Sequence, residues 1–314
     1  MSAEGLVVES AACLLCGASN GAPTVASGTD YEYGTTERIF SFKRCARCDH
    51  VYMDPRPAPE SSAVIYPRTY FTFSGGHSGG VLGSIKDVVL RRRVRRLLAA
   101  IPSEGRVLEI GSGDGAFLNS IRKARPDLQL VASDLDFSDE QRRALDRSTI
   151  GYVDGMFESA DIPGPFHLIV MNQLIEHLWD VRKSLTKIRA ILAPGGRLSL
   201  STPNLEGWDR KYFASSAWGG YYFPRHLNLF TPASLTRLLS EHGLEVVHIK
   251  QLVAPLVWVG SCHNALKMRD SRWRAVFRDR NLLALAAFTA LDTAASRLGA
   301  STSNMQVIAR RRDC

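Results

Sequence analysis

The sequence lacks the long apolar segments with which proteins cross membranes. Its two longest nearly uninterrupted apolar runs, 252–260 and 282–291, reach about half of the roughly 20 residues that a bilayer-spanning helix needs. The first ten residues have neither a basic start nor an apolar core of signal-peptide length. We therefore expect no transmembrane helix and a cytoplasmic protein.

Extreme composition is absent as well. With 45% hydrophobic residues the chain is not of the disordered class, and its 314 residues are enough for one large domain and a small accessory unit. The formal net charge of +8 is moderate. It is compatible with an anionic substrate, a nucleic acid or a membrane surface, and it does not choose among them.

Cysteine is scarce, with six in the chain, and four of the six occur as two C-x-x-C pairs. A glycine follows the first pair and an aspartate the second, and both are turn-forming residues that suit a metal knuckle. A disulfide is disfavoured in a cytoplasmic chain, and a redox C-x-x-C motif would need no twin. The spacing therefore predicts a structural zinc ion. Its predicted ligands are Cys13, Cys16, Cys45 and Cys48.

The strongest pattern in the sequence is the stretch 106–118, R-V-L-E-I-G-S-G-D-G-A-F-L. A short apolar run, then Gly111, Gly113 and Gly115, then an apolar-periodic segment predict a buried strand, a tight turn and a helix. Glycine lets the backbone approach a ligand closely, and the free N–H groups of the new helix point at that ligand. The spacing also satisfies the dinucleotide fingerprint G-x-G-x-x-G/A, with Asp134 downstream for ribose hydroxyls.

Glu109 decides between two kinds of ligand. With the glycines it spells E-x-G-x-G-x-G, and here the sequence resembles motif I of class I S-adenosylmethionine-dependent methyltransferases. A carboxylate at this point suits the cationic amino-acid end of S-adenosylmethionine, whereas it would repel the pyrophosphate of a nicotinamide dinucleotide. The segments L-x-P-G-G at 192–196 and T-P-N at 202–204 extend the resemblance over most of 105–245. Together with the alternation of predicted strands and helices, it implies an α/β fold with a doubly wound, seven-stranded Rossmann-like sheet.

The resemblance also implies which residues bind the cofactor. Asp134, at the end of the second predicted strand, is expected to accept both ribose hydroxyls, with Leu135 against the adenine. The loop after the third strand is expected to hold the adenine amino group, at Asp154 or Met156. The turn that leaves the fourth strand, 166–171, completes the site. The cofactor-binding residues predicted in this way are Glu109, Gly111, Gly113, Gly115, Asp134, Leu135, Met156, Asn172 and Gln173.

Three further residues are candidates for catalysis. Glu176-His177 resembles the E-H pair of ubiquinone-type O-methyltransferases and of zinc-ribbon sugar C-methyltransferases. His226 lies at the end of an aromatic insert, 205–230, that suits the wall of a substrate pocket. Because an imidazole titrates near neutral pH, His226 or His177 is predicted to be the base, with Glu176 orienting or assisting it. The alternative for each histidine is a structural role, as a capping or packing residue.

The patterns divide the chain into parts. Alternation over 31–42 predicts a hairpin, the aromatic and then glycine-rich 66–80 predicts a flap, and a helix over 85–101 is expected to turn its arginines to solvent. The parts are a zinc-ribbon module, 1–57; the flap with the leading amphipathic helix, 58–104; and a class I methyltransferase domain, 105–314, with its aromatic insert, 205–230, and a helical insert, 252–300.

The function that the resemblance implies is methyl transfer from S-adenosylmethionine to a small-molecule or sugar-type biosynthetic intermediate. An RNA methyltransferase is the alternative among enzymes, favoured by the charge and the ribbon and disfavoured by the lack of an N-P-P-Y-type motif. A non-catalytic nucleotide-binding module is the alternative outside enzymes. For the helical insert, packing on the sheet is the favoured interpretation, and contact with a membrane or a lipid-linked substrate is the other.

Overall fold

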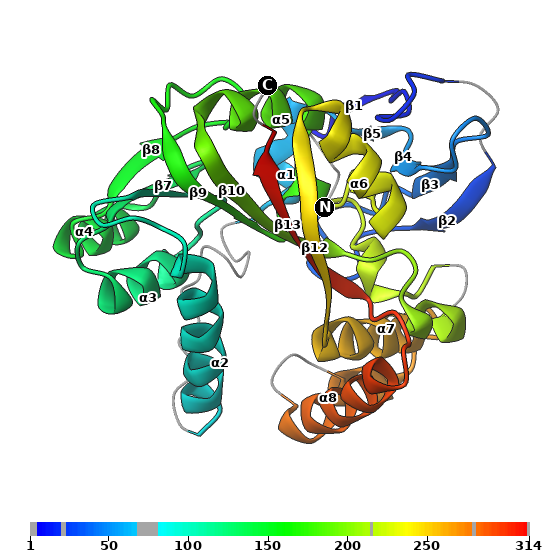
Figure 1. Ribbon diagram of the computed structural model, residues 1–314. Helices are drawn as coiled ribbons and strands as arrows, with labels where there is room; N and C mark the ends of the chain where they lie inside the picture. Colours follow the sequence, from blue (N-terminus) through cyan, green and yellow to red (C-terminus); the bar gives the residue numbers. More distant parts are fainter. Residues whose placement is uncertain (1–4, 20–22, 68–80, 214–215, 278–280, 313–314) are drawn as a thin grey trace.

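The fold is centred on a seven-stranded mixed sheet (Figure 1). The computed structural model describes residues 5–19, 23–67, 81–213, 216–277 and 281–312. Along the sheet the strands are β12 (Leu244–Leu252), β13 (Asn304–Arg311), β10 (Leu192–Pro203), β9 (Phe166–Asn172), β6 (Arg106–Ile110), β7 (Gln129–Asp134) and β8 (Gly151–Asp154). Neighbours from β10 to β8 are parallel, and β13 lies antiparallel between β10 and β12. The predicted doubly wound, seven-stranded α/β sheet is confirmed.

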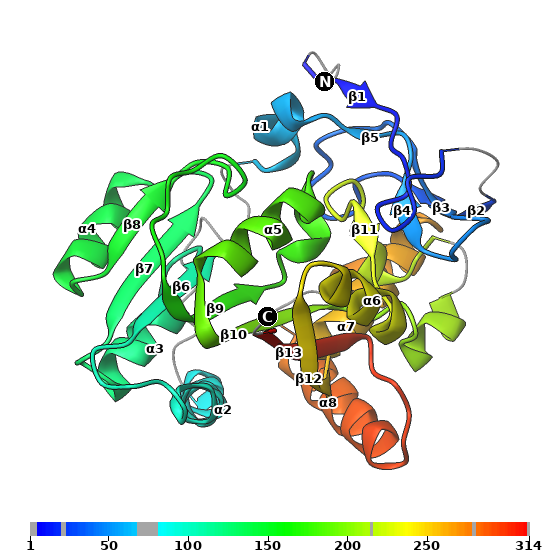
Figure 2. The same ribbon diagram turned by 45° about the horizontal axis from the view of Figure 1, so that its top comes forward.

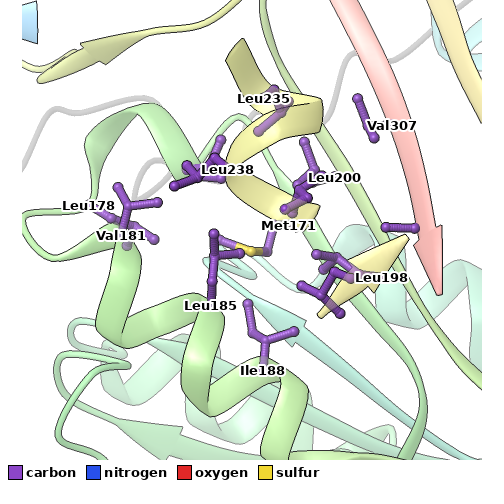
Figure 3. Close-up of a cluster of buried hydrophobic side chains, with 14 of the residues drawn as sticks. Met171, Leu178, Val181, Leu185, Ile188, Leu198, Leu200, Leu235, Leu238 and Val307 are labelled. Atoms are coloured by element: carbon purple, nitrogen blue, oxygen red, sulfur yellow. The ribbon is translucent and has the colours of Figure 1, made fainter. Parts of the chain in front are cut away.

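Helices cover both faces of this sheet. They are α2 (Val81–Leu98), α3 (Ala116–Ala124) and α4 (Asp139–Arg147) on one face, and α5 (Val181–Ile191) and α6 (Pro232–Glu241) on the other. Figure 3 shows the hydrophobic core between the sheet and the helices α5 and α6, where Leu185 and Ile188 of α5 and Leu238 of α6 lie around Met171 of β9. Because the central strands are covered on both faces, they read as continuous apolar runs and not as an alternating pattern.

Two of the covering helices begin at reciprocal caps. The Ser138 side chain accepts from the backbone N–H of Gln141, whose side chain accepts from the backbone N–H of Ser138, at the start of α4. Thr231 and Ser234 do the same for α6, with Pro232 in its first turn. Such caps satisfy N–H groups that a first helical turn leaves without partners. The start of α6 is therefore fixed directly after the aromatic insert.

The N-terminal module is a set of short antiparallel strands. The strands β2 (Thr24–Gly28), β3 (Phe40–Arg44) and β4 (Val51–Met53) form one sheet, and β1 (Val8–Glu9) pairs with β5 (Arg56–Pro57). A two-residue strand from the aromatic insert, β11 (Asn228–Leu229), pairs with β4 and becomes the fourth strand of the sheet formed by β2, β3 and β4. The module and the insert therefore share a sheet, although they lie far apart in the sequence.

The strands of the hairpin predicted over 31–42 are β2 and β3, so most of the predicted segment is the connection between them. The reason is Asp30, whose carboxylate accepts hydrogen bonds from the backbone N–H groups of Tyr33 and Thr35 at 3.0 and 2.9 Å. These bonds fold the first residues of the segment into a turn, as a short acidic side chain commonly does. Strand pairing therefore begins only outside this turn.

The segment between the module and the sheet contains α1 (Ser62–Ile65) and α2. Most of the predicted flap, 68–80, lies outside the described residues. The predicted leading helix is present as α2, which ends three residues before the predicted end at 101. Four of its arginines are exposed as expected, namely Arg91, Arg92, Arg95 and Arg96. Arg93 is the exception and is considered with the site.

The remaining inserts are helical. The aromatic insert contains η3 (Trp208–Phe213) and η4 (Gly219–Tyr221), and the chain after β12 forms α7 (Pro255–Lys267), η5 (Arg272–Val276) and α8 (Leu282–Arg297). Both views show α7 and α8 side by side beyond the ends of β12 and β13 (Figures 1 and 2). Of the helices in the described ranges, none combines the length and apolarity needed to cross a membrane.

Candidate active site

The glycine turn connects β6 to α3 as the sequence predicts. Gly111 and Gly115 have φ angles of +70° and +69°, a left-handed conformation that side chains rarely adopt. A Cβ on Gly111 would lie 3.0 Å from a methyl carbon of Leu174, and the Gly111 N–H donates to the carbonyl of Ser133 on β7 at 2.7 Å. The turn is therefore held close to β7 with no room for a side chain at its first residue.

A cavity lies at the carboxyl ends of β6, β7 and β9. This edge is where ligands bind in open α/β sheets. Predicted cofactor residues that line it are Gly111, Asp134, Leu135, Met156, Asn172 and Gln173, and the predicted catalytic residue His177 lines it too. Glu109, Gly113 and Gly115 lie behind this lining. Of the two alternatives for the adenine amino group, the structure places Met156 on the cavity, while Asp154 accepts from the N–H of Phe137 at 2.9 Å.

Glu109 is a buried acid beside this cavity, only 2% exposed. Its Oε1 accepts from the Asn172 side-chain amide at 3.0 Å, and its Oε2 has no hydrogen-bond partner among the described residues. Burial raises the pKa of Glu109 to about 8, although Asn172 and the nearby Arg93 favour the ionised form. Glu109 therefore offers a buried hydrogen-bond acceptor without a partner among the described residues at the end of β6.

Arg93 is the functional candidate that the sequence reasoning missed. It reaches from α2 into the site, donates to Asn172 Oδ1 and lies over the Phe117 ring, 5.4 Å from its centroid. Its Nε atom has no hydrogen-bond partner among the residues that the structure describes. The sequence predicts that the arginines of this helix lie largely on its solvated face, and Arg93 is the exception. Its spacing was the available signal, because it falls three residues after Leu90 and four before Leu97, on the apolar face.

Asp134 ends β7 with its carboxylate already oriented. Oδ2 accepts from the N–H of Gly113 at 2.7 Å, and Oδ1 accepts from the N–H of Leu135 at 2.8 Å. Burial raises its pKa, which these two hydrogen bonds oppose. The glycine turn and the acid thus hold each other in place, an interaction that the sequence analysis did not predict.

The three candidate catalytic residues come together at one point. Glu176 and His177 lie in η2 (Ile175–His177), and His226 comes from the aromatic insert. The rings of His177 and His226 are 4.7 Å apart, and His226 Nε2 lies 4.0 Å from Glu176 Oε1. Thr202 at the end of β10 donates to Glu176 Oε2 at 2.8 Å, and the Leu227 N–H donates to the Glu176 carbonyl at 2.7 Å.

The tautomer of His226 follows from its partner. Its Nδ1 lies 2.8 Å from the carbonyl oxygen of Gly220, and a carbonyl only accepts, so Nδ1 carries the proton and Nε2 carries a lone pair. Burial, together with the charge of Arg225, lowers the pKa of His226 to about 4. The ring is therefore neutral at physiological pH, with its basic nitrogen on the side of Glu176 and not of Gly220.

The neighbours of His226 are neutral too. Burial lowers the pKa of His177 well below its ordinary value, and Tyr66 lies with its hydroxyl 3.0 Å from His177 Nδ1. Burial likewise raises the pKa of Glu176 to about 8. At neutral pH the two imidazoles and the carboxylic acid of this cluster are therefore uncharged, while burial and the charge of Arg225 disfavour a proton on either imidazole.

The N-terminal module holds the segment that carries His226. Arg225 forms a buried ion pair with Asp30, through two hydrogen bonds of 3.0 and 2.8 Å. Burial alone would raise the pKa of Asp30, but the bonds from Arg225 outweigh burial and hold it at about 2. Three residues after Arg225, Asn228 Oδ1 lies 3.1 Å from His50 Nε2 of the module. Because both charges are fully buried and paired, this contact tolerates little movement.

The four paired cysteines also lie together, away from the cavity. Their sulfur atoms are all within 4.8 Å of one another, and the two shortest separations are 3.4 Å, too long for a disulfide. The two knuckles share one hydrogen-bond pattern, in which the N–H four residues after the first cysteine donates to its carbonyl, from Gly17 at 2.8 Å and from Asp49 at 2.9 Å. A tetrahedral zinc site with bonds of about 2.3 Å has sulfur separations of about 3.8 Å, so four such thiolates fit the metal.

The fold and the cavity define a Rossmann-like enzyme that binds a nucleotide-type cofactor at the glycine turn. The sequence profile of the family described as "Methyltransferase domain" matches residues 84–249. The chain is 31% identical over 179 residues to the ubiquinone biosynthesis O-methyltransferase of Cereibacter sphaeroides, which covers 52% of this chain and 70% of that protein. The chain therefore belongs to this methyltransferase family and is an S-adenosylmethionine-dependent methyltransferase.

Two further similarities bear on function and fold. The tRNA 5-carboxymethoxyuridine methyltransferase of Escherichia coli is 28% identical over 144 residues, which covers 43% of this chain and 54% of that protein. The structure of 1,6-didemethyltoxoflavin-N1-methyltransferase from Burkholderia thailandensis covers 90% of this chain and 99% of that one, with a TM-score of 0.50 at 18% identity. That likeness shows the fold alone, and it agrees with the predicted methyltransferase sheet.

Proposed function

We propose that this enzyme methylates a small-molecule or sugar-type biosynthetic intermediate, with His226 as the base that receives the acceptor's proton. The observation that carries the proposal is the neutral His226 imidazole, whose Nδ1 is committed to the Gly220 carbonyl. Its Nε2 therefore carries the lone pair that can accept a proton, within a cluster that reaches the cavity through His177. The similarity to an O-methyltransferase of ubiquinone biosynthesis supports an acceptor of biosynthetic type.

The residues around Glu109 suit the amino-acid end of S-adenosylmethionine, which carries an ammonium and a carboxylate. We assign the ammonium to Glu109 Oε2 and the carboxylate to Arg93, with Asn172 bonded to both side chains. Asp134 would take the ribose hydroxyls, and Leu135 and Met156 the adenine. The glycines of the turn and Gln173 would complete the donor site.

Replacing Arg93 with methionine tests this assignment. A hydrogen bond to a charged group contributes about 1.5–3 kcal/mol, so the variant should bind S-adenosylhomocysteine about 10- to 100-fold more weakly in calorimetric titrations. The matched control is Arg95→Met, two residues along the same helix, where the side chain is exposed. A loss of less than threefold for Arg93→Met, or an equal loss for Arg95→Met, contradicts the role of Arg93.

Methyl transfer from a sulfonium is an in-line displacement, and S-adenosylmethionine supplies the electrophilic methyl group. The chain has to place the acceptor atom in line with that methyl group and remove a proton where the acceptor requires it. We assign proton removal to His226 Nε2. His177 and Glu176 would orient the acceptor, because Tyr66 and Thr202 respectively fix their side chains.

We also propose that Cys13, Cys16, Cys45 and Cys48 bind a structural zinc ion and that residues 1–57 act as a zinc ribbon. Its contacts with the aromatic insert, through Asp30–Arg225 and β4–β11, give this module the role of holding the wall of the acceptor site. The flap and leading helix, 58–104, and the catalytic domain, 105–314, are the other functional parts in this proposal.

An RNA acceptor is the second candidate, because one relative is named as a tRNA methyltransferase and the net charge is +8. A screen with radiolabelled S-adenosylmethionine separates the two candidates. We expect label in a nucleotide-linked or other small-molecule fraction and none in unmodified tRNA. Label in tRNA alone would replace the proposed acceptor class, and no label in any fraction, despite cofactor binding, would favour a non-catalytic module.

A further inference from the structure

The outer side of α8 is an exposed apolar surface. No charged residue occurs between Leu282 and Leu291, and these two leucines are 52% and 43% exposed. Leu283 beside them is 84% exposed. Exposed apolar side chains that gather on a stretch of helix without charges mark an interaction surface, whereas single exposed leucines are ordinary.

The acid of this helix faces inward and fixes its orientation. Asp292 is fully buried, and its Oδ1 accepts from the indole N–H groups of Trp208 and Trp258 at 3.0 and 3.2 Å. Its Oδ2 accepts from the N–H of Ala254 at 2.7 Å. Because Asp292 is bonded to the protein in this way, the side of α8 opposite to it, which carries Leu283 nine residues earlier, is held outward.

The segment just before α8 adds positive charge and an interfacial aromatic residue. Over 267–277 there are four basic residues and one acid. Arg269 and Arg272 are exposed, and Trp273 is 63% exposed with the Arg272 guanidinium 5.8 Å from its ring centroid. Tryptophan and arginine next to exposed leucines are the composition of helices that lie in the headgroup region of a bilayer.

We propose that α8 and η5 form a peripheral membrane-binding surface that takes an anionic lipid bilayer. Charge complementarity selects this occupant, because anionic headgroups neutralise Arg269 and Arg272 while the acyl region receives Leu282 and Leu283. A second copy of the chain, packed through the same patch by two-fold symmetry, would instead bring two positively charged segments into one interface. Figures 1 and 2 both place α8 at the periphery of the molecule, away from the N-terminal module.

Vesicle sedimentation with the full chain tests the proposal. Wild type should sediment with vesicles of phosphatidylcholine and phosphatidylglycerol and bind pure phosphatidylcholine vesicles at least tenfold more weakly. Two double variants, Trp273→Ala with Leu283→Glu and Arg269→Glu with Arg272→Glu, should each weaken binding to the anionic vesicles about tenfold or more. All variants should keep wild-type affinity for S-adenosylhomocysteine, which verifies that they are folded. The vesicle test does not depend on the identity of the methyl acceptor.

The control is a pair of exposed arginines on α4, at the opposite edge of the sheet. Arg143→Glu with Arg147→Glu removes as much charge and should change vesicle binding less than twofold. Equal losses in both arginine pairs would mean that net charge and not this surface binds the vesicles. Absence of sedimentation with anionic vesicles overturns the proposal. The proposal is also overturned if the wild-type chain is a dimer that does not bind vesicles and the double variant Trp273→Ala with Leu283→Glu is a monomer.

Discussion

Replacing His226 with glutamine should lower kcat about 100- to 10,000-fold, the usual contribution of a positioned general base. The reason is local, since Gly220 holds the ring so that Nε2 alone is left to accept a proton. The affinity for S-adenosylhomocysteine should stay within about twofold, because His226 does not line the cofactor cavity. The measurement is single-turnover methyl transfer to the acceptor identified by the labelled-donor screen.

His177→Gln is the matched control, because His177 lies beside His226 and is held by Tyr66. We expect its kcat to fall less than tenfold. The pKa of His226 is about 4, so a neutral base is available throughout pH 6–8 and its protonation should lower the rate only as the pH falls toward 4. A His226→Gln variant within tenfold of wild type would remove His226 from the mechanism, and the reverse order of the two variants would transfer the role to His177.

Loss of the cysteine site should be the most destabilising change in the molecule. Structural zinc contributes on the order of 10 kcal/mol in small modules, and Cys13 and Cys45 are buried in the main hydrophobic core. Cys45→Ser should therefore abolish bound zinc and strongly lower the melting temperature. Elemental analysis for zinc, together with thermal melting before and after treatment with a chelator, measures both effects.

Cys262→Ser is the control for this experiment, since Cys262 is a half-buried lone cysteine in α7. It should retain one zinc per chain and melt close to wild type. Because Asp30 and Arg225 connect the module to the His226 segment, zinc loss should also lower turnover more than it lowers cofactor affinity. A chain purified without zinc, with unchanged melting after chelation, would contradict the ribbon.

The parts of the fold that the sequence predicts well are those encoded over short distances. The apolar run, the glycines and Asp134 lie within one strand-turn-helix-strand unit, so their spacing was enough to place the cavity. The two cysteine pairs were equally easy to recognise in the sequence, because each knuckle is built from its own backbone hydrogen bonds.

The parts that the sequence did not predict depend on contacts between distant segments. The spacing of Arg93 puts it on the apolar face of α2, but its contacts with Asn172 and Phe117 follow only from the packing of α2. The pairing of Asp30 with Arg225 joins residues 195 positions apart, and neither residue belongs to a motif. Asp30 also accepts the hydrogen bonds that form a turn after it, and this turn lies where the sequence predicted the start of a hairpin. Tertiary contacts of this kind override local pattern, and they set the position of His226.

The central claim is that Glu109 and Arg93 make the glycine turn a site for a donor with an amino-acid end and not for a pyrophosphate. Burial raises the pKa of Glu109 to about 8, and a bound ammonium group favours its ionised form, so binding should release a proton and strengthen as the pH rises.

Calorimetric titration at pH 6.0 and pH 7.5 tests this claim most directly. We predict that S-adenosylmethionine binds about tenfold more tightly at the higher pH, that Glu109→Gln binds more weakly and loses this dependence, and that NAD does not bind. Binding of NAD in preference to S-adenosylmethionine would contradict the account.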